Sequence, residues 1–197
     1  MLNLTSAGDG NYLRFLASAN EWQHNKTAIS LKHFVLDMGS VRTGWGKMAE
    51  GVAPDWQWDE VAGRSGKQPS PEHRRGFSVD VFIKGVGKLE WATISVGSAM
   101  GFEKLYVEAF KLLDASPQNV PVVEYTGSAA IKVGKGNTRR PDFTIVKWIP
   151  RNSIPWDAEA APAAPAAPAP TAALDDYVSP FSSAKLPPPV DGSFSDF

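Results

Sequence analysis

An alanine- and proline-rich stretch divides this chain of 197 residues into two parts of different character. Residues 158–173 are almost entirely alanine and proline, and no apolar periodicity of useful length follows them. Such a stretch buries too little apolar surface to offset the entropy lost on ordering, so it predicts an extended, semi-rigid spacer. We therefore expect a folded domain over residues 1–156, a linker over 157–173 and a disordered acidic tail over 174–197.

Short β-type runs separated by Gly, Pro and Asp dominate the predicted domain. Apolar patterning predicts barrel strands over residues 28–36, 76–84, 88–96, 120–126 and 142–149. One amphipathic helix is expected between the third and fourth of these strands, capped by Ser98 and ended by Pro117. Three strands, a helix and two strands are the order of the five-stranded Greek-key barrel of the oligonucleotide/oligosaccharide-binding (OB) type. The sequence thus predicts a mainly β, OB-like fold, with a plain β-sandwich as the alternative.

The segment between the first two predicted barrel strands is expected to be an insertion or an extended first hairpin. Residues 37–40 should turn the chain, so that residues 41–48 return beside the first strand. Residues 49–75 contain three prolines, two tryptophans and several charges, and are expected to form a long loop. Long loops in compact domains are usually functional or disordered.

Enzymatic and metal-binding patterns are scarce in this sequence. The absence of cysteine excludes disulfides, thiolate zinc sites and thiol catalysis. The three histidines form no zinc-binding spacing, and no complete phosphate-binding loop or nucleophile elbow is present. We therefore expect neither an enzyme nor a cofactor or metal site. The N-terminus lacks signal-peptide character and no apolar run approaches the ~20 residues of a membrane span, so we expect a soluble, cytoplasmic protein.

Aromatic residues interleaved with basic residues mark the candidate site. Single-stranded nucleic acid is held by aromatic rings that stack on bases and by Lys and Arg that neutralise phosphates. The candidate nucleic-acid-binding residues are Arg42, Trp45, Lys47, Trp56, Trp58, Arg64, Lys67, Arg74, Arg75, Lys132, Lys135, Arg139 and Arg140.

The alternative explanation of these residues is structural. Trp91 and Trp148 lie on regular strands and are expected in the core, whereas Trp56 and Trp58 lie in a charged, proline-containing segment. Glycines flank Trp45, which would let a base approach its ring. The basic residues 132–140 would line phosphates or else form an ordinary solvated hairpin tip.

Charge separates the domain from the tail. Residues 1–151 contain 19 Lys and Arg against 15 Asp and Glu, whereas residues 152–197 contain one Lys against six Asp and Glu. A basic body and an acidic tail are typical of proteins that bind polyanions and also basic partners. An ordinary surface with a solubility tail is the alternative.

The tail ends in a short aromatic and acidic tip that includes Phe194, Asp196 and Phe197. A terminal ring can fill an apolar pocket while Asp196 and the α-carboxylate pair with surrounding bases. A basic barrel, a Pro-rich linker and a tip closing on Asp-Phe resemble bacterial and bacteriophage single-stranded-DNA-binding proteins, and are closer to the phage pattern.

The resemblance implies a protein that coats exposed single-stranded DNA during replication, recombination and repair. It further implies that the tip recruits replication or recombination proteins, and a homo-oligomer is compatible with it. Two alternatives remain: an RNA-binding or recombination-accessory module, and a structural protein of a virus particle.

Overall fold

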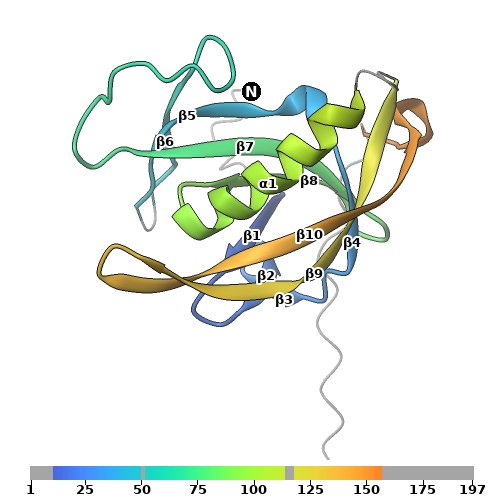
Figure 1. Ribbon diagram of the computed structural model, residues 1–197, viewed down its shortest axis with the longest axis horizontal. Helices are drawn as coiled ribbons and strands as arrows, with labels where there is room; N and C mark the ends of the chain where they lie inside the picture. Colours follow the sequence, from blue (N-terminus) through green and yellow to red (C-terminus); the bar gives the residue numbers. More distant parts are fainter. Residues whose placement is uncertain (1–10, 50–51, 114–117, 157–197) are drawn as a thin grey trace, which may run out of the picture. The chain divides into compact units, whose positions relative to one another are not determined.

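The computed structural model describes residues 11–49, 52–113 and 118–156, which form a mainly β domain with one long helix (Figure 1). Within these residues ten strands belong to one sheet, and helix α1 (Val96–Leu113) packs on it. The predicted linker and tail, including the tip residues, lie outside the described residues. The strands are β1 (Tyr12–Leu16), β2 (Glu21–His24), β3 (Thr27–Ile29), β4 (His33–Leu36), β5 (Arg42–Lys47), β6 (Asp55–Trp58), β7 (Arg74–Ile83), β8 (Gly87–Thr93), β9 (Asn119–Val133) and β10 (Gly136–Pro150).

The first two strands were not predicted from the sequence. β1 and β2 form an antiparallel hairpin, and β1 also pairs in parallel with β8. Leu13 and Phe15 of β1 are buried and alternate with exposed residues, as a strand with one buried face requires. Asn25 and Lys26 both have positive φ, so they form the tight two-residue connection between β2 and β3.

Residues 37–40 do not reverse the chain as predicted. A short 3₁₀ turn, η1 (Met38–Ser40), is capped by Asp37, whose carboxylate accepts a hydrogen bond from the Gly39 N–H at 3.1 Å. The strands on either side of η1, β4 and β5, both pair antiparallel with β7. The chain therefore continues in one direction through the turn, and residues 33–47 act as one interrupted strand along β7.

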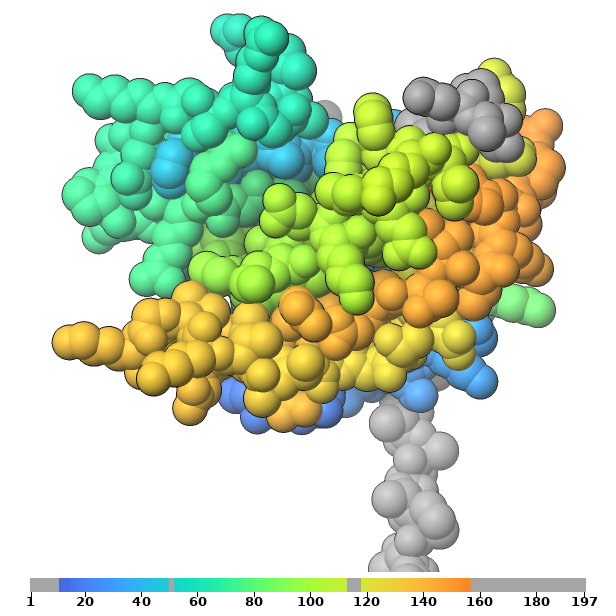
Figure 2. Space-filling model, in the orientation of Figure 1, coloured from blue at the N-terminus to red at the C-terminus, as the bar shows by residue number. Residues whose placement is uncertain are grey.

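The predicted basic loop between the last two strands is instead part of a long hairpin, whose register shifts at two places in β10. β9 and β10 each span 15 residues and pair from Asn119↔Pro150 to Val133↔Gly136. The turn is Gly134-Lys135, and Gly134 has a φ of 58°, a conformation that favours glycine. The outer end of this hairpin projects from the body in the space-filling view (Figure 2), and we call residues 128–141 the arm.

The two ends of the sheet share one aromatic core. Trp22 of β2 contacts Tyr125 of β9, with ring centroids 5.7 Å apart, and Phe143 of β10, 6.1 Å apart. The sheet therefore curls until β2, next to one end, and β9 and β10, at the other end, bury their rings together. Trp91, on β8, is fully buried as predicted, whereas Trp148 packs at the edge of the core and is only partly buried.

Helix α1 closes on the sheet through an aromatic stack and two glycines. Phe102 stacks on Phe77 of β7 with centroids 4.0 Å apart. A Cβ added to Gly97 or Gly101 would lie 2.2 or 2.3 Å from a carbonyl oxygen of β10, so only glycine permits this approach. The helix begins at Val96, not at Ser98 as predicted; Ser98 is buried inside it, and no described residue hydrogen-bonds its hydroxyl.

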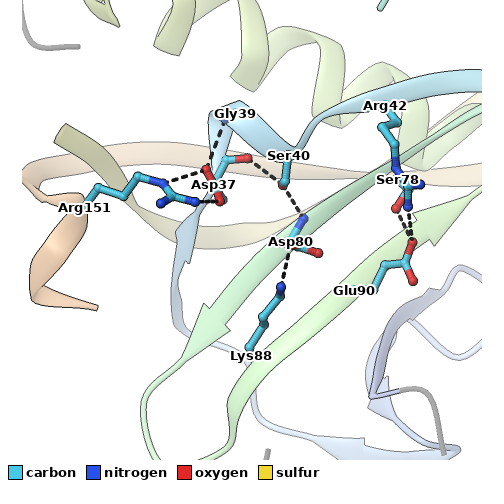
Figure 3. A network of polar contacts seen from close by, with 9 residues as sticks. All are labelled: Asp37, Gly39, Ser40, Arg42, Ser78, Asp80, Lys88, Glu90 and Arg151. Carbon is cyan, nitrogen blue, oxygen red and sulfur yellow. Dashed lines mark hydrogen bonds and ion pairs between the residues drawn. The ribbon is translucent and has the colours of Figure 1, made fainter. Parts of the chain in front are cut away.

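The last described residues return to the domain. Arg151 forms an ion pair with the buried carboxylate of Asp37 (Figure 3). Trp156 contacts Phe82, with ring centroids 6.3 Å apart, and donates its indole N–H to the Arg151 carbonyl at 3.1 Å.

The prediction of a mainly β domain with one helix between the third and fourth mapped strands is confirmed. The sheet is larger than the predicted five strands because β1, β2 and β6 were not recognised as strands. In the part of the chain that the structure describes, no helix is both long and apolar enough to cross a membrane.

His24 predicts how stability depends on pH. Its ring is 1% exposed, neither ring nitrogen bonds to a described residue, and burial lowers the pKa of His24 below its ordinary 6.5. As pH falls below about 6.5, the unfolded chain takes up a proton that the folded protein resists. We therefore expect the free energy of unfolding, measured by urea denaturation, to fall by up to about 1.4 kcal/mol per pH unit.

The variant His24→Leu should lose this pH dependence because leucine does not titrate. The variant His33→Gln is the matched control, since His33 is exposed. An equal pH dependence in His24→Leu and wild type would contradict the prediction.

Candidate nucleic-acid interface

The sheet register divides the predicted binding residues of β5, β6 and β7 between two faces. Residues directly opposite each other on paired strands point to the same side. Gly44 pairs with Trp58 and Gly46 with Trp56, whereas Trp45 pairs with Gln57 and Arg75. We call the side that faces away from α1 the outer face, and it carries Arg42, Gly44, Gly46, Trp56, Trp58, Arg74 and Gly76. The opposite side, the inner face, carries Trp45, Lys47 and Arg75.

Trp56 and Trp58 stack on each other on the outer face. Their ring centroids are 4.3 Å apart and their planes differ by 8°. Both side chains are only partly buried. An aromatic pair of this kind, left partly accessible to water, presents a flat apolar surface of the type on which nucleobases stack.

Glycines make room for these rings. A Cβ on Gly46 would lie 2.8 Å from the Trp56 ring, and one on Gly76 would lie 2.8 Å from the same ring and 2.3 Å from the Thr93 carbonyl. A Cβ on Gly44 would lie 3.1 Å from the Trp58 ring. The glycines that flank Trp45 in sequence therefore serve Trp56 and Trp58 across the sheet, and not the approach of a base to Trp45.

Two arginines accompany the tryptophan pair. The Arg42 guanidinium lies over the Trp58 ring, 4.5 Å from its centroid, and 3.4 Å from the Glu90 carboxylate. Arg74 is exposed, and its side chain has no hydrogen bond or ion pair with another described residue. The outer face thus combines ring surface with cations, which is the composition that binds single strands.

The inner face holds the loop of residues 59–73 in place. Arg75 makes a bidentate ion pair with Asp59, at 2.8 and 2.7 Å, and its guanidinium lies 5.3 Å from the Trp45 ring centroid. The Trp45 indole donates to the Gly66 carbonyl at 3.0 Å. The hydrogen bonds from Arg75 hold the pKa of the Asp59 carboxyl below its ordinary value, with further help from Thr43. Trp45 and Arg75 are therefore engaged in fixing a loop.

A second group of contacts secures the end of the same loop. Lys47 pairs with Glu72. The buried His73 ring is bonded by Ser70 at 2.8 Å and by Asp55 of β6 at 3.2 Å. These contacts join the loop to β5 and β6 and hold it in a fixed position.

Arg64 and Lys67 are exposed on this loop. Neither side chain forms a hydrogen bond or ion pair with another described residue. The Arg64 backbone N–H donates to the Val61 carbonyl. Both remain available for phosphate.

The arm presents two free cations and two engaged ones. Lys132 and Lys135 are exposed, and neither side chain contacts an acidic group among the described residues. Arg139 donates to the Ser128 hydroxyl at 2.8 Å, and Arg140 pairs with Asp142 at 3.0 Å. The two free lysines lie at or near the turn of the hairpin.

The predicted residues thus fall into three places: the outer face, the ordered loop with its inner-face anchors, and the arm. Sequence reasoning missed Ser78 and Glu90, which lie beside Arg42, because only the sheet register brings them there. It also missed Tyr12 of β1, which is 45% exposed and stands opposite Glu90 of β8. In the described ranges, no group of three or more His, Asp or Glu side chains is arranged to hold a metal ion.

No protein-family model matches this chain, and neither the search of curated proteins nor that of solved structures found a significant match.

The anchoring of the loop by Asp59 can be tested by limited proteolysis. Asp59 is 2% exposed at its side chain, so Asp59→Asn removes a buried charge and weakens both bonds to Arg75. We expect a loss of roughly 1–3 kcal/mol in unfolding free energy. We also expect trypsin to cleave faster after Arg64 and Lys67 in this variant than in wild type, as monitored by mass spectrometry.

Glu60→Gln is the control, because Glu60 is the next residue in the chain, is exposed and has no side-chain hydrogen bond or ion pair with another described residue. Equal cleavage rates for wild type and Asp59→Asn would show that the loop is held by other contacts.

Proposed function

We propose that this protein is a non-enzymatic binder of single-stranded nucleic acid, with single-stranded DNA as its principal ligand. The observation that carries the proposal is the stacked, partly exposed Trp56–Trp58 pair with Arg42 over one ring. Exposing two neighbouring indoles to water is unfavourable, and an exposed apolar patch of this kind marks an interaction site.

Stacking explains why the ligand would be single-stranded and of any sequence. Every nucleobase has a π-face, but in a duplex those faces are already covered by neighbouring base pairs. Stacking on an aromatic side chain contributes about 1–3 kcal/mol per base and differs little between bases. The tryptophan pair therefore favours unpaired bases without selecting a sequence.

The free cations account for the phosphate part of the ligand. Arg74 on the outer face, Arg64 and Lys67 on the loop, and Lys132 and Lys135 on the arm all lack a partner among the described residues. Each lysine or arginine that neutralises a phosphate releases counterions and strengthens binding at low salt. The described pairing leaves these five cations free, while Arg75, Arg139 and Arg140 are engaged.

We further propose that the domain contains an OB-like barrel of five strands. The first is β4 continued by β5, and the others are β7, β8, β9 and β10; β1–β3 and β6 are additions to it. Three features support this. The helix lies between β8 and β9, β9 pairs antiparallel with both β4 and β10, and β7 lies between β4 and β8. In that fold the ligand lies on the second and third strands and between the loops after the first and fourth, which here are the 59–73 loop and the arm.

The biological role that we propose follows from the resemblance to bacterial and bacteriophage single-stranded-DNA-binding proteins. The domain would coat exposed single strands in replication, recombination and repair. The acidic tail, with Phe194, Asp196 and Phe197 at its tip, would recruit a basic partner protein.

Substitutions of Trp58, on the outer face, and of Trp45, on the inner face, should affect binding and stability differently. Trp58→Ala should weaken binding of oligo-dT by about 1–3 kcal/mol and leave the melting temperature nearly unchanged, because the ring is partly exposed. Trp45→Ala should instead lower the melting temperature and release the 59–73 loop, so that any loss of affinity accompanies a loss of stability. Intrinsic fluorescence titration gives the affinity, with oligo-rU and duplex DNA as competitors.

If wild-type protein does not bind oligo-dT at low salt, the proposed function is wrong. If oligo-rU competes better than oligo-dT, the RNA-binding alternative replaces it.

The arm should set the salt dependence of binding. The double variant Lys132→Ala/Lys135→Ala should reduce the slope of log K against log salt by about 1.4, since each phosphate contact to a single strand contributes about 0.7. Lys104→Ala/Lys111→Ala removes the same charge from the exposed side of α1 and should leave the slope unchanged. Equal slopes for the two double variants would exclude the arm from the phosphate path.

A further inference from the structure

The ring of Trp58 is covered by a residue of the protein itself. Trp56 stacks on Trp58 at 4.3 Å, and the Arg42 guanidinium lies 4.5 Å from the Trp58 centroid. Along the paired strands Trp56 stands opposite Gly46 and Trp58 opposite Gly44, and Arg42 is the next outer-face position of β5. Arg42 therefore lies on the side of Trp58 away from Trp56, where a nucleobase would otherwise stack.

Glu90 holds Arg42 in this place. Its carboxylate lies 3.4 Å from the Arg42 guanidinium and accepts a hydrogen bond from the Ser78 hydroxyl (Figure 3). Ser78 stands directly opposite Arg42 on β7, so the hydroxyl positions the acid beside the arginine. The carboxylate is 31% exposed and the arginine 55%, so the pair is accessible to a ligand.

A single strand would compete with both contacts of Arg42. A planar guanidinium stacks on an indole much as a base does, and it binds phosphate as readily as carboxylate. When a base stacks on the outer side of Trp58, Arg42 has to leave the ring, and its natural partner becomes the phosphate of that nucleotide. Glu90 then lies next to a phosphate without its cation, which is unfavourable.

We propose that Glu90 acts as a restraint on nucleic-acid binding, because it keeps Arg42 over Trp58 in the free protein. This inference rests on the proposed function and adds a regulatory contact to the same site. The affinity is thereby lowered and binding becomes an exchange, in which base and phosphate replace the arginine and the carboxylate. Such an exchange lets a coating protein leave a strand again without losing its binding surface.

The test compares Glu90→Gln with Asp80→Asn. Glutamine keeps the size of the side chain and its bond to Ser78, but no longer attracts Arg42. Asp80 also lies on the outer face of β7, but its carboxylate pairs with Lys88 at 2.8 Å. Asp80→Asn therefore removes one negative charge, as Glu90→Gln does, without changing a contact of Arg42. We expect Glu90→Gln to bind oligo-dT about two- to fivefold more tightly than Asp80→Asn.

A second measurement needs no nucleic acid. Acrylamide is an uncharged quencher, and the difference between each protein and its Trp58→Phe derivative isolates the Trp58 fluorescence. We expect Trp58 to be quenched more strongly in Glu90→Gln than in wild type or Asp80→Asn, since Arg42 no longer covers the ring.

Equal affinities for Glu90→Gln and Asp80→Asn, or equal quenching of Trp58 in wild type and Glu90→Gln, would overturn the inference. Failure of the wild-type protein to bind oligo-dT would instead refute the proposed function. In that case the quenching experiment still decides whether Glu90 holds Arg42 over the ring.

Discussion

The packing of aromatic rings around the buried Trp91 is the interaction on which the rest of the domain depends. Its indole is fully buried on β8 and lies within ring-contact distance of Trp22, Phe34, Phe77 and Phe143 on four other strands, and of Phe102 on α1. Strands far apart in the sheet thus bury their aromatic rings around one side chain. Because cores pack near crystalline density, this cluster fixes how far the sheet curls and where the helix lies against it. Both the outer face and the arm take their positions from that curl.

The outer face of the same sheet depends on small residues, which leave room for large rings. Glycines at three outer positions of β5 and β7 leave a shallow floor, and Trp56 and Trp58 of the edge strand β6 lie over it. The rings are held by the backbone beneath them, yet they are not enclosed by side chains. A surface made in this way is rigid and partly accessible, which suits stacking on a flexible strand because little ordering remains to be done on binding.

The inner face uses its polar residues for structure. Asp59, Arg75 and Trp45 fix the 59–73 loop through a buried ion pair, a ring contact and an indole hydrogen bond. The alternation of side chains along a strand therefore gives neighbouring residues opposite tasks: Arg42 lies at the proposed binding surface, and Trp45, three positions later, anchors a loop. The restraint by Glu90 belongs to the outer side of this division.

The sequence by itself determined the mainly β character, the helix between the third and fourth mapped strands and the burial of Trp91, because apolar periodicity is a local property of the chain. It also marked the interleaved aromatic and basic residues of the candidate site. Only the tertiary structure decided which of these residues share a face. The register of β5 against β6 and β7 places Gly44 beneath Trp58 and Gly46 beneath Trp56, and it places Glu90 beside Arg42. Register depends on pairing between distant segments, and a shift of one residue would exchange the two faces, so no local pattern could have specified it.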